Sequence, residues 1–185
     1  MKILGIEGGP RKDGNTEKLV RQVLAGAQET GCRTEFLKLA ELTINYCRGC
    51  GSCRATGQCV IEDDMDRVVE AIQQSDVVVL GSPIYAWQVS GTTKVFMDRL
   101  CRLITPKFES RLNGPKKIAF AYTQGNPDPS LFKPYFDYQE RVYSLLGFTV
   151  AGRVQAAGTQ AKDDILSQEE TLAEAHSFGL KLAKR

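Results

Sequence analysis

Long apolar segments are absent from this sequence of 185 residues. Apolar runs such as 77–80 and 118–121 are far shorter than the roughly 18 residues that a membrane-spanning helix needs. The chain also passes from Met1 almost directly into a glycine-rich segment, without the long apolar stretch and small-residue cleavage site of a secretory signal. We therefore expect a cytoplasmic protein that does not cross a membrane.

An excess of one charge is missing as well. The 24 basic and 22 acidic side chains give a formal net charge of +2, and the two signs are scattered together along the chain. Proteins that bind nucleic acid usually carry a basic stripe, which this sequence lacks. The charge pattern therefore argues against a nucleic acid as partner.

Histidine is scarce, since His176 is the only one. A G-x-S-x-G motif is also absent, so a Ser-His-Asp hydrolase would have neither its nucleophile elbow nor a base near the glycine-rich loops. Asp63 and Asp64 could act as paired carboxylates in hydrolysis, but helix starts favour acidic residues in any case. The sequence thus argues against a hydrolase, and we expect a surface or packing role for His176.

What the chain does contain is a regular alternation of short apolar segments and amphipathic ones. Its length, with 42% hydrophobic and 25% charged residues, fits one domain covering residues 1–185. The patterns predict strands at 2–6, 34–39, 76–81, 117–123 and 148–154, and helices at 15–27, 65–72, 91–103, 131–146 and 165–182. Because parallel strands need right-handed crossovers, this order predicts an α/β fold with a doubly wound, five-stranded parallel sheet between two helical layers. Ligands should bind in the loops after the first, third and fourth strands.

The loop after the first strand is rich in glycine and leads into a helix. From Gly9 it reads G-x4-G-N-T, so Asn15 stands where a P-loop carries its phosphate-binding lysine, and the dinucleotide fingerprint G-x-G-x-x-G is absent too. Backbone N–H groups at the start of a helix bind anions, and Arg11 adds positive charge, which predicts a cradle for a terminal phosphate. The alternative is an ordinary turn in which Asn15 caps the helix.

The loop after the third strand carries two aromatic side chains. Tyr85 and Trp87 could line a flat ring bound at the end of the sheet. The alternative is that this single tryptophan packs in the core or in an oligomer interface, as aromatic side chains often do.

Together the two loops resemble those of the flavodoxin-like NAD(P)H-dependent FMN reductase family, which read like G-S-P-R-x-x-G-N-T and P-x-Y-x-x-x-x-S-G. Here they are G-G-P-R-K-D-G-N-T at 8–16 and P-I-Y-A-W-Q-V-S-G at 83–91, and the segment 94–99 resembles the family's K-x-F-x-D-R. The resemblance implies that FMN is bound by Gly9, Pro10, Arg11, Gly14, Asn15, Thr16, Pro83, Ile84, Tyr85, Ala86, Trp87, Thr123, Gly125 and Asn126. Gly9 departs from the family, which usually has serine there, so FMN either binds more weakly or relies on backbone N–H groups and Arg11.

Four of the six cysteines fall within a cysteine-rich loop at 47–59. They follow the pattern C-x2-C-x2-C-x5-C and are Cys47, Cys50, Cys53 and Cys59. In a reducing cytosol such clustered thiols indicate a metal site before they indicate disulfides. Three cysteines at two-residue gaps can hold three corners of a [4Fe-4S] cluster, which a fourth thiolate completes. Zinc, whose usual sites pair two C-x2-C knuckles across a longer gap, and free thiols are the alternatives. We expect Cys32 and Cys101 to be buried structural thiols.

The cysteine run is similar to the compact motif of the iron-sulfur flavoproteins, a branch of the same family. The resemblance implies an FMN-dependent oxidoreductase in which the flavin carries the chemistry and no amino-acid acid or base is needed. NAD(P)H or, with a cluster present, ferredoxin would donate electrons, and a quinone, free flavin or other small molecule would accept them. A homodimer or homotetramer is implied as well. The alternatives are a non-catalytic redox- or metal-responsive protein that uses the cysteine loop and a zinc-stabilised binding module.

Overall fold

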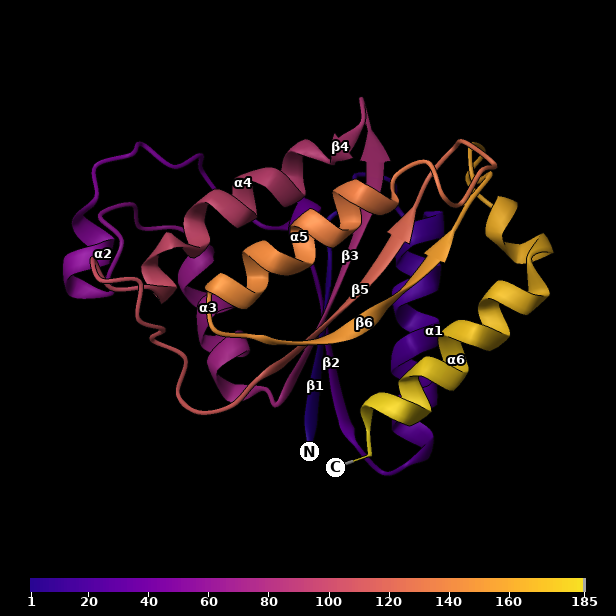
Figure 1. The fold of residues 1–185 in the computed structure, drawn as a ribbon, viewed down its shortest axis with the longest axis horizontal. Coiled ribbons are helices and arrows are strands. Elements are labelled where there is room, and N and C mark those ends of the chain that lie inside the picture. Colours follow the sequence, from indigo (N-terminus) through magenta and orange to yellow (C-terminus); the bar gives the residue numbers. More distant parts are fainter. Residues whose placement is uncertain (185) are drawn as a thin grey trace.

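The computed structural model describes residues 1–184 and places five parallel strands in one sheet (Figure 1). In the order β2-β1-β3-β5-β6 the strands are β2 (Arg33–Lys38), β1 (Lys2–Glu7), β3 (Val77–Tyr85), β5 (Lys117–Thr123) and β6 (Thr149–Ala156). The chain crosses to the other side of β1 when it passes from β2 to β3, which creates a topological switch point between β1 and β3. The predicted flavodoxin-like, doubly wound α/β fold is confirmed.

Helices cover both faces of the sheet and complete three layers (Figure 1). One face carries α1 (Asn15–Glu29) and α6 (Glu169–Leu182), and the other carries α3 (Met65–Gln74), α4 (Gly91–Arg99) and α5 (Lys133–Leu145). A short helix, α2 (Ser52–Thr56), lies in the cysteine-rich loop. The helices α1 and α6 pack closely because Gly26 and Gly179 have no side chains, and a Cβ at Gly26 would overlap the carbonyl oxygen of His176. His176 itself is partly buried and contacts the exposed Glu29 at 2.9 Å, which fits the predicted surface or packing role.

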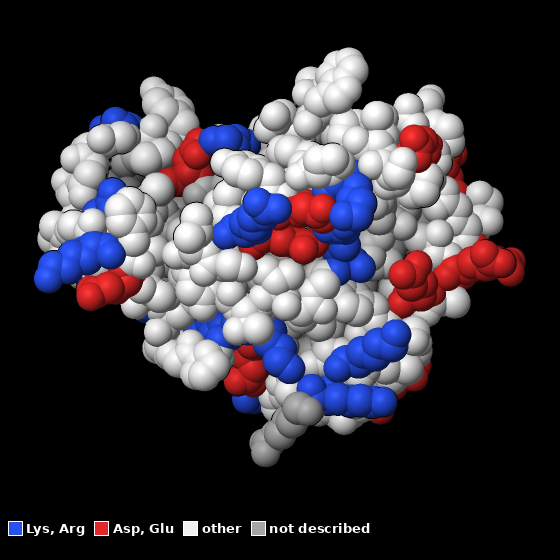
Figure 2. Space-filling model, in the orientation of Figure 1, with Lys and Arg blue, Asp and Glu red and all other residues white. Residues whose placement is uncertain are grey.

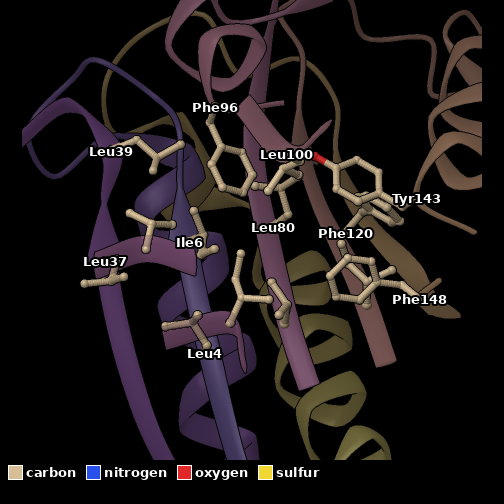
Figure 3. Packing of buried hydrophobic residues seen from close by; sticks show 14 of the residues in the cluster. Leu4, Ile6, Leu37, Leu39, Leu80, Phe96, Leu100, Phe120, Tyr143 and Phe148 are labelled. Atoms are coloured by element: carbon tan, nitrogen blue, oxygen red, sulfur yellow. The ribbon is translucent and has the colours of Figure 1, made fainter. Parts of the chain in front are cut away.

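The larger apolar core lies between the sheet and helices α3, α4 and α5 (Figure 3). Successive side chains of a strand point to opposite faces, so Leu4 and Ile6 of β1 join this core while Ile3 packs under α1 and α6. Two rings in this core, Tyr122 and Phe136, stack with centroids 4.1 Å apart. Such a pair stabilises a fold by about 0.5–1.5 kcal/mol beyond its buried area. The sheet on which the loops stand is therefore firmly packed.

The end of β3 differs from the prediction, which placed a loop from residue 82. The strand continues through Tyr85, because Ser82 and Pro83 still pair with the end of β5. It then turns back through Ala86 and Trp87 into β4 (Gln88–Val89), which pairs antiparallel with β3. Both turn residues have positive φ, 46° and 64°, as the hairpin turn of this length requires.

Within residues 1–184 no helix has the length and the apolar character needed to cross a membrane. On the face shown in Figure 2, basic and acidic side chains are interspersed. Arg153, for example, lies between Asp137 and Glu140 at 2.9 and 2.6 Å. This mixture matches the balanced charge of the sequence.

Candidate functional site

A cleft of about 200 Å³ lies at the carboxyl ends of β1, β3 and β5, beside the switch point. The predicted residues that line it are Gly9, Pro10, Arg11, Gly14, Asn15, Thr16, Pro83, Ile84, Tyr85, Thr123 and Gly125. Four further residues, Glu7, Gln124, Thr159 and Gln160, line it without having been predicted. Ala86, Trp87 and Asn126 are not among the lining residues. The three loops thus meet as the sequence indicates, while their binding role stays a prediction.

The glycine-rich loop leaves the start of α1 open. The residue that precedes α1 is Gly14, and no side chain caps the helix there. Asn15 does not act as the cap, because its side chain instead donates to the carbonyl of Ala161 at 2.6 Å and accepts from the amide of Ile165 at 3.3 Å. The alternative of an Asn15-capped turn is therefore wrong. An uncapped helix start keeps N–H groups and the positive end of the helix dipole available for an anion.

Buried polar contacts hold this loop in shape. Lys38 of β2 donates to the backbone carbonyl of Arg11 at 2.9 Å and to the carboxylate of Glu17 at 2.7 Å. Burial alone would raise the pKa of Glu17, but hydrogen bonds from Lys38 and Arg21 together lower it, so Glu17 is a carboxylate. The Arg11 guanidinium in turn donates to the carbonyl of Gln160 at 2.7 Å. The loop is preorganised and has a cationic side chain at its rim.

Hydroxyl groups connect the glycine-rich loop to the two neighbouring strand ends. Thr16 and Thr123 share a hydrogen bond of 2.6 Å between their hydroxyl oxygens. Ser90, the residue before α4, donates from its hydroxyl to the carbonyl of Gly8 at 2.5 Å and accepts from the amide of Thr93 at 3.1 Å. The three loops therefore form one hydrogen-bonded unit around the cleft.

Glu7, the last residue of β1, is a site residue that the sequence analysis missed. Its side chain is buried, and one oxygen, Oε1, accepts from the amide of Gly9 at 2.6 Å. Burial raises the pKa of Glu7 to about 7, although the Gly9 amide and Lys38 oppose the shift. The available signal was an acidic residue at the end of an otherwise apolar strand, where burial would be expected to perturb it.

The aromatic residues of the second loop behave differently from each other. Tyr85 lines the cleft and is 41% exposed, whereas Trp87 at the hairpin tip is 73% exposed. The alternative in which Trp87 packs in the core is therefore wrong. Its left-handed backbone conformation is unusual for a bulky residue and is found mostly where function or tight turns demand it.

The cysteine-rich loop lies far from the C-terminal helix, at the end of the molecule marked by α2 in Figure 1. Cys47 and Cys50 are exposed, and Cys53 and Cys59 are partly buried. Within residues 1–184 no three cysteine, histidine or acidic side chains converge closely enough to hold a metal ion. The four thiols therefore do not converge on one point in this arrangement.

A fifth thiol belongs to the same region. Burial raises the pKa of the Cys53 thiol, and the neighbouring thiols of Cys59 and Cys101 raise it further. The expectation that Cys101 is a buried structural thiol is wrong, since it is exposed, and Cys32 is only partly buried. Cys101 follows Leu100 in a 3-10 turn after α4, and the buried side of this turn is occupied by Leu100 and Leu103 instead.

Three arginines outside the cysteine-rich loop and one within it bind backbone carbonyls in or near the loop. Arg99 donates to the carbonyl of Asn45, Arg102 to that of Gly57, and Arg111 to those of Arg54 and Ala55. The Arg54 guanidinium itself donates to two carbonyls beyond α4 and lies over the ring of Phe108. Two of these arginines are also ion-paired, Arg99 with Asp63 and Arg102 with Asp66, so the loop is held by a network of both charges.

Comparisons with known proteins agree with this architecture. The family model described as NADPH-dependent FMN reductase matches residues 1–162. An iron-sulfur flavoprotein of Archaeoglobus fulgidus is 42% identical over 185 residues, which are 100% of this chain and 80% of the relative. An iron-sulfur flavoprotein of Methanocaldococcus jannaschii is 44% identical over 99 residues, 54% of this chain, and the match spans only about half, 51%, of that relative.

A solved structure has the same fold at low sequence identity. The FMN-dependent NADH-azoreductase of Bacillus anthracis, crystallised with FMN, superimposes with a TM-score of 0.73 over 100% of both chains at 14% identity. Since the family model covers most of the chain, the glycine-rich loop and both strand-end loops included, the protein belongs to the NADPH-dependent FMN reductase family.

Proposed function

We propose that this protein is an oxidoreductase that binds FMN in the cleft and passes electrons through it from a donor to a small-molecule acceptor. One observation carries the proposal: in a chain of the NADPH-dependent FMN reductase family, the uncapped start of α1 and the ends of β3 and β5 line one cleft. The donor is NAD(P)H or a ferredoxin-type protein, and the chain acts as a single FMN-binding unit.

The residues of the cleft suit a phosphate monoester attached to a flat ring. The open helix start and Arg11 supply N–H donors and positive charge at one end. The strand end from Pro83 to Tyr85 and the segment around Gly125 form the two sides between which a ring system would lie. Ala86 and Asn126 adjoin these sides, and we include them with Trp87 as outer contacts of the ring.

When bound, FMN supplies both two-electron and one-electron redox chemistry. The protein's part is then to orient the ring and to leave one face open to a donor or acceptor. Tyr85 and Trp87 are exposed beside the cleft and offer an aromatic surface for that second molecule. No side chain has to transfer a proton in this scheme.

The finer part of the proposal concerns the cysteine-rich loop, to which we assign a [4Fe-4S] cluster on Cys47, Cys50, Cys53 and Cys59. The spacing, the name of the Archaeoglobus fulgidus relative and the surrounding arginines support it. Within residues 1–184 the buried Nε groups of Arg54, Arg99 and Arg111 have no hydrogen-bond partner, so N–H donors are free in the region of the loop. Because the four thiols do not converge in this arrangement, we assign no electron-transfer step to the cluster.

The test is to purify the protein without oxygen and to count FMN, iron and zinc per chain beside a visible absorption spectrum. We expect about one FMN, and about four irons if the cluster is present. FMN without iron would remove the cluster and keep the FMN-dependent enzyme. Zinc without FMN would favour a zinc-stabilised binding module, and neither FMN nor metal would refute the proposal as a whole.

Turnover separates an enzyme from a non-catalytic redox-responsive protein. The exposed Cys50 thiol favours that second candidate, because hydrogen bonds from the backbone and side chain of Ser52 lower its pKa and so favour the reactive thiolate. We expect the FMN-loaded protein to oxidise NADH or NADPH with a quinone or free flavin, or to accept electrons from reduced ferredoxin. If none of these reactions occurs while thiol oxidation changes the protein, the second candidate is correct.

We also propose a homodimer or homotetramer. Large apolar side chains stand exposed on the described part of the chain, among them Trp87, Tyr46 and Phe108, and such aromatic residues are enriched in interfaces. Light scattering coupled to size-exclusion chromatography measures the assembly directly, and a monomer at micromolar concentration would contradict the proposal.

A further inference from the structure

Glu7 occupies a place where an acidic side chain is unexpected, beside the loop that is proposed to hold a phosphate. Its side chain is 1% exposed, and it lines the cleft. The oxygen Oε1 accepts from the amide of Gly9, while within residues 1–184 the buried oxygen Oε2 has no hydrogen-bond partner. A buried polar atom without a partner costs about 1–3 kcal/mol and therefore points to a group that is missing from the structure.

The carboxyl group fills the space that a side chain at position 9 would take. A Cβ added at Gly9 would overlap Oε1 of Glu7, so any larger residue there would displace the carboxyl group. Glu7 and Gly9 are therefore a matched pair, in which the carboxyl group replaces a side chain of the loop itself. A neutral carboxyl group has both an acceptor and an O–H donor, whereas a carboxylate has acceptors only.

The charges that face Glu7 do not fix it in the ionised form. On β2 the Lys38 ammonium would favour the carboxylate, but its charge is already paired with Glu17 of α1 at 2.7 Å. Arg21 of α1 also favours the carboxylate, and Glu17 disfavours it. Arg11, the cation of the loop, donates to the carbonyl of Gln160. The neutral form is thus accessible near neutral pH.

We propose that Glu7 is a binding-determining residue of the phosphate loop, and that FMN binds to the form of the protein in which the Glu7 carboxyl group is protonated. This inference rests on the proposed function. Ionised Glu7 opposes binding in two ways: its charge repels the phosphate, and its charge-assisted hydrogen bond holds the Gly9 amide more strongly. Protonated Glu7 removes the repulsion and gains an O–H donor.

The pH dependence follows from the sign of this linkage. Since the pKa of Glu7 in the FMN-free protein is raised to about 7, the binding-competent fraction is nearly complete at pH 6 and falls to about a tenth at pH 8. The Kd for FMN should therefore rise about tenfold from pH 6 to pH 8, and binding above pH 7 should take up a proton. The phosphate of FMN titrates near pH 6 itself, so a matched variant is needed.

The test compares the wild type with Glu7→Gln in titrations of the apoprotein with FMN from pH 5.5 to 8.5, followed by flavin fluorescence. Glutamine keeps the acceptor for Gly9 and adds an N–H donor that does not titrate, so we expect about equal affinities at pH 6 and about tenfold tighter binding by the variant at pH 8. Riboflavin, which lacks the phosphate, should bind with the same pH dependence to both proteins. Parallel FMN profiles would overturn the inference alone, whereas absence of FMN and riboflavin binding at every pH would overturn the proposed function as well.

A second measurement does not depend on FMN. Infrared difference spectra of the apoprotein between pH 6 and pH 8 should contain the carbonyl band of one protonated carboxyl group, which Glu7→Gln and Glu7→Ala both lack. If Glu7→Gln does not fold, Glu7→Ala takes its place in the FMN titrations. Alanine at position 7 does not titrate, so the rise in Kd between pH 6 and pH 8 that is due to Glu7 should be absent from Glu7→Ala as well. A band that persists in both variants would contradict the assignment to Glu7.

Discussion

Arg99 and Asp63 hold both ends of the cysteine-rich loop. Their side chains are 1% and 2% exposed, and the guanidinium binds the carboxylate through two contacts of 2.7 and 3.1 Å. Arg99 also donates to the carbonyl of Asn45, before the loop. Asp63 lies four residues after the loop and accepts from the Asn45 amide. Burial alone would raise the pKa of Asp63, but Arg99 and the amides of Asn45 and Met65 together lower it to about 2.

The first prediction concerns the acid stability that this pair provides. The folded pKa of Asp63, about 2, lies below the ordinary value of 3.8, so protonation favours the unfolded chain. The contribution, about 2 kcal/mol, is therefore complete above about pH 4 and is lost as the pH falls toward 2. In urea denaturation, Asp63→Asn should lower the free energy of unfolding at pH 7 by at least that amount, and the deficit should shrink at pH 3.

Asp98→Asn is the matched control, because Asp98 pairs with Lys94 on the exposed face of α4. Exposed pairs contribute about 0–1 kcal/mol, so this variant should change the free energy of unfolding by less than Asp63→Asn does. Equal effects of the two substitutions, or a pH-independent deficit for Asp63→Asn, would show that the buried pair is not what holds the loop.

At the scale of elements, the β3–β4 hairpin is strained. Ala86 and Trp87 both have positive φ in a two-residue turn that usually contains asparagine and glycine. The strain costs about 1 kcal/mol for each residue with a Cβ, and native proteins keep such strain mainly where function needs it. Trp87 at the tip of the turn is 73% exposed and does not line the cleft, so the strained turn holds its ring out in solvent.

The second prediction follows from this strain. Ala86→Gly should raise the free energy of unfolding by about 1 kcal/mol, because glycine adopts the left-handed conformation without steric cost. The same substitution at Ala173, on the exposed side of α6, should lower it by about 1 kcal/mol. Thermal or urea unfolding of the two variants measures the change in the free energy of unfolding for each. A lower free energy of unfolding in Ala86→Gly would mean that the turn is not strained.

The long elements could be predicted from the sequence because each is long enough to show its own period. Strand β5 was predicted with its observed bounds, 117–123, since every residue after Lys117 is buried in the middle of the sheet. Short elements have no such signal, so β4 and α2 were missed. The proline at 83 suggested a loop, although β3 continues past it because β5 still pairs there.

The parts of the candidate site that depend on local backbone chemistry could be predicted from the sequence. The parts that depend on contacts between residues far apart in the sequence could not. Glycines just before a helix indicate an anion-binding loop whatever the rest of the fold, so the glycine-rich loop could be identified from the sequence. The perturbed carboxyl of Glu7 depends on burial by neighbouring elements, and the role of Asn15 depends on a segment about 150 residues away. The local pattern marks Glu7 as unusual but does not give its pKa, and it gives no sign of the partners of Asn15.

At the scale of the molecule, α4 connects the cleft to the cysteine-rich loop (Figure 1). Ser90, just before α4, binds the glycine-rich loop, and Arg99 at the end of α4 binds Asn45 and Asp63, which flank the cysteine-rich loop. Nine helical residues span roughly 13 Å, and none of the residues that line the cleft belongs to the cysteine-rich loop. Within one chain, the two regions are therefore built from separate sets of side chains.

The third prediction is that these regions load independently. If the proposed cluster is present, replacing Cys47, Cys50, Cys53 and Cys59 together by serine should abolish iron binding. The Kd for FMN should change by less than about twofold, because no cleft contact is removed. The reciprocal variant, Arg11→Ala, should raise the Kd for FMN about tenfold, because it loses one charge-assisted contact of about 1.5 kcal/mol or more. Its iron content should not change. Iron analysis and FMN titration of both variants provide the measurement.

If the variant without the four thiols also loses FMN binding, the cysteine-rich loop contributes to a flavin site. In a homo-oligomer this would be the flavin site of a neighbouring copy, because the loop does not line the cleft of its own chain.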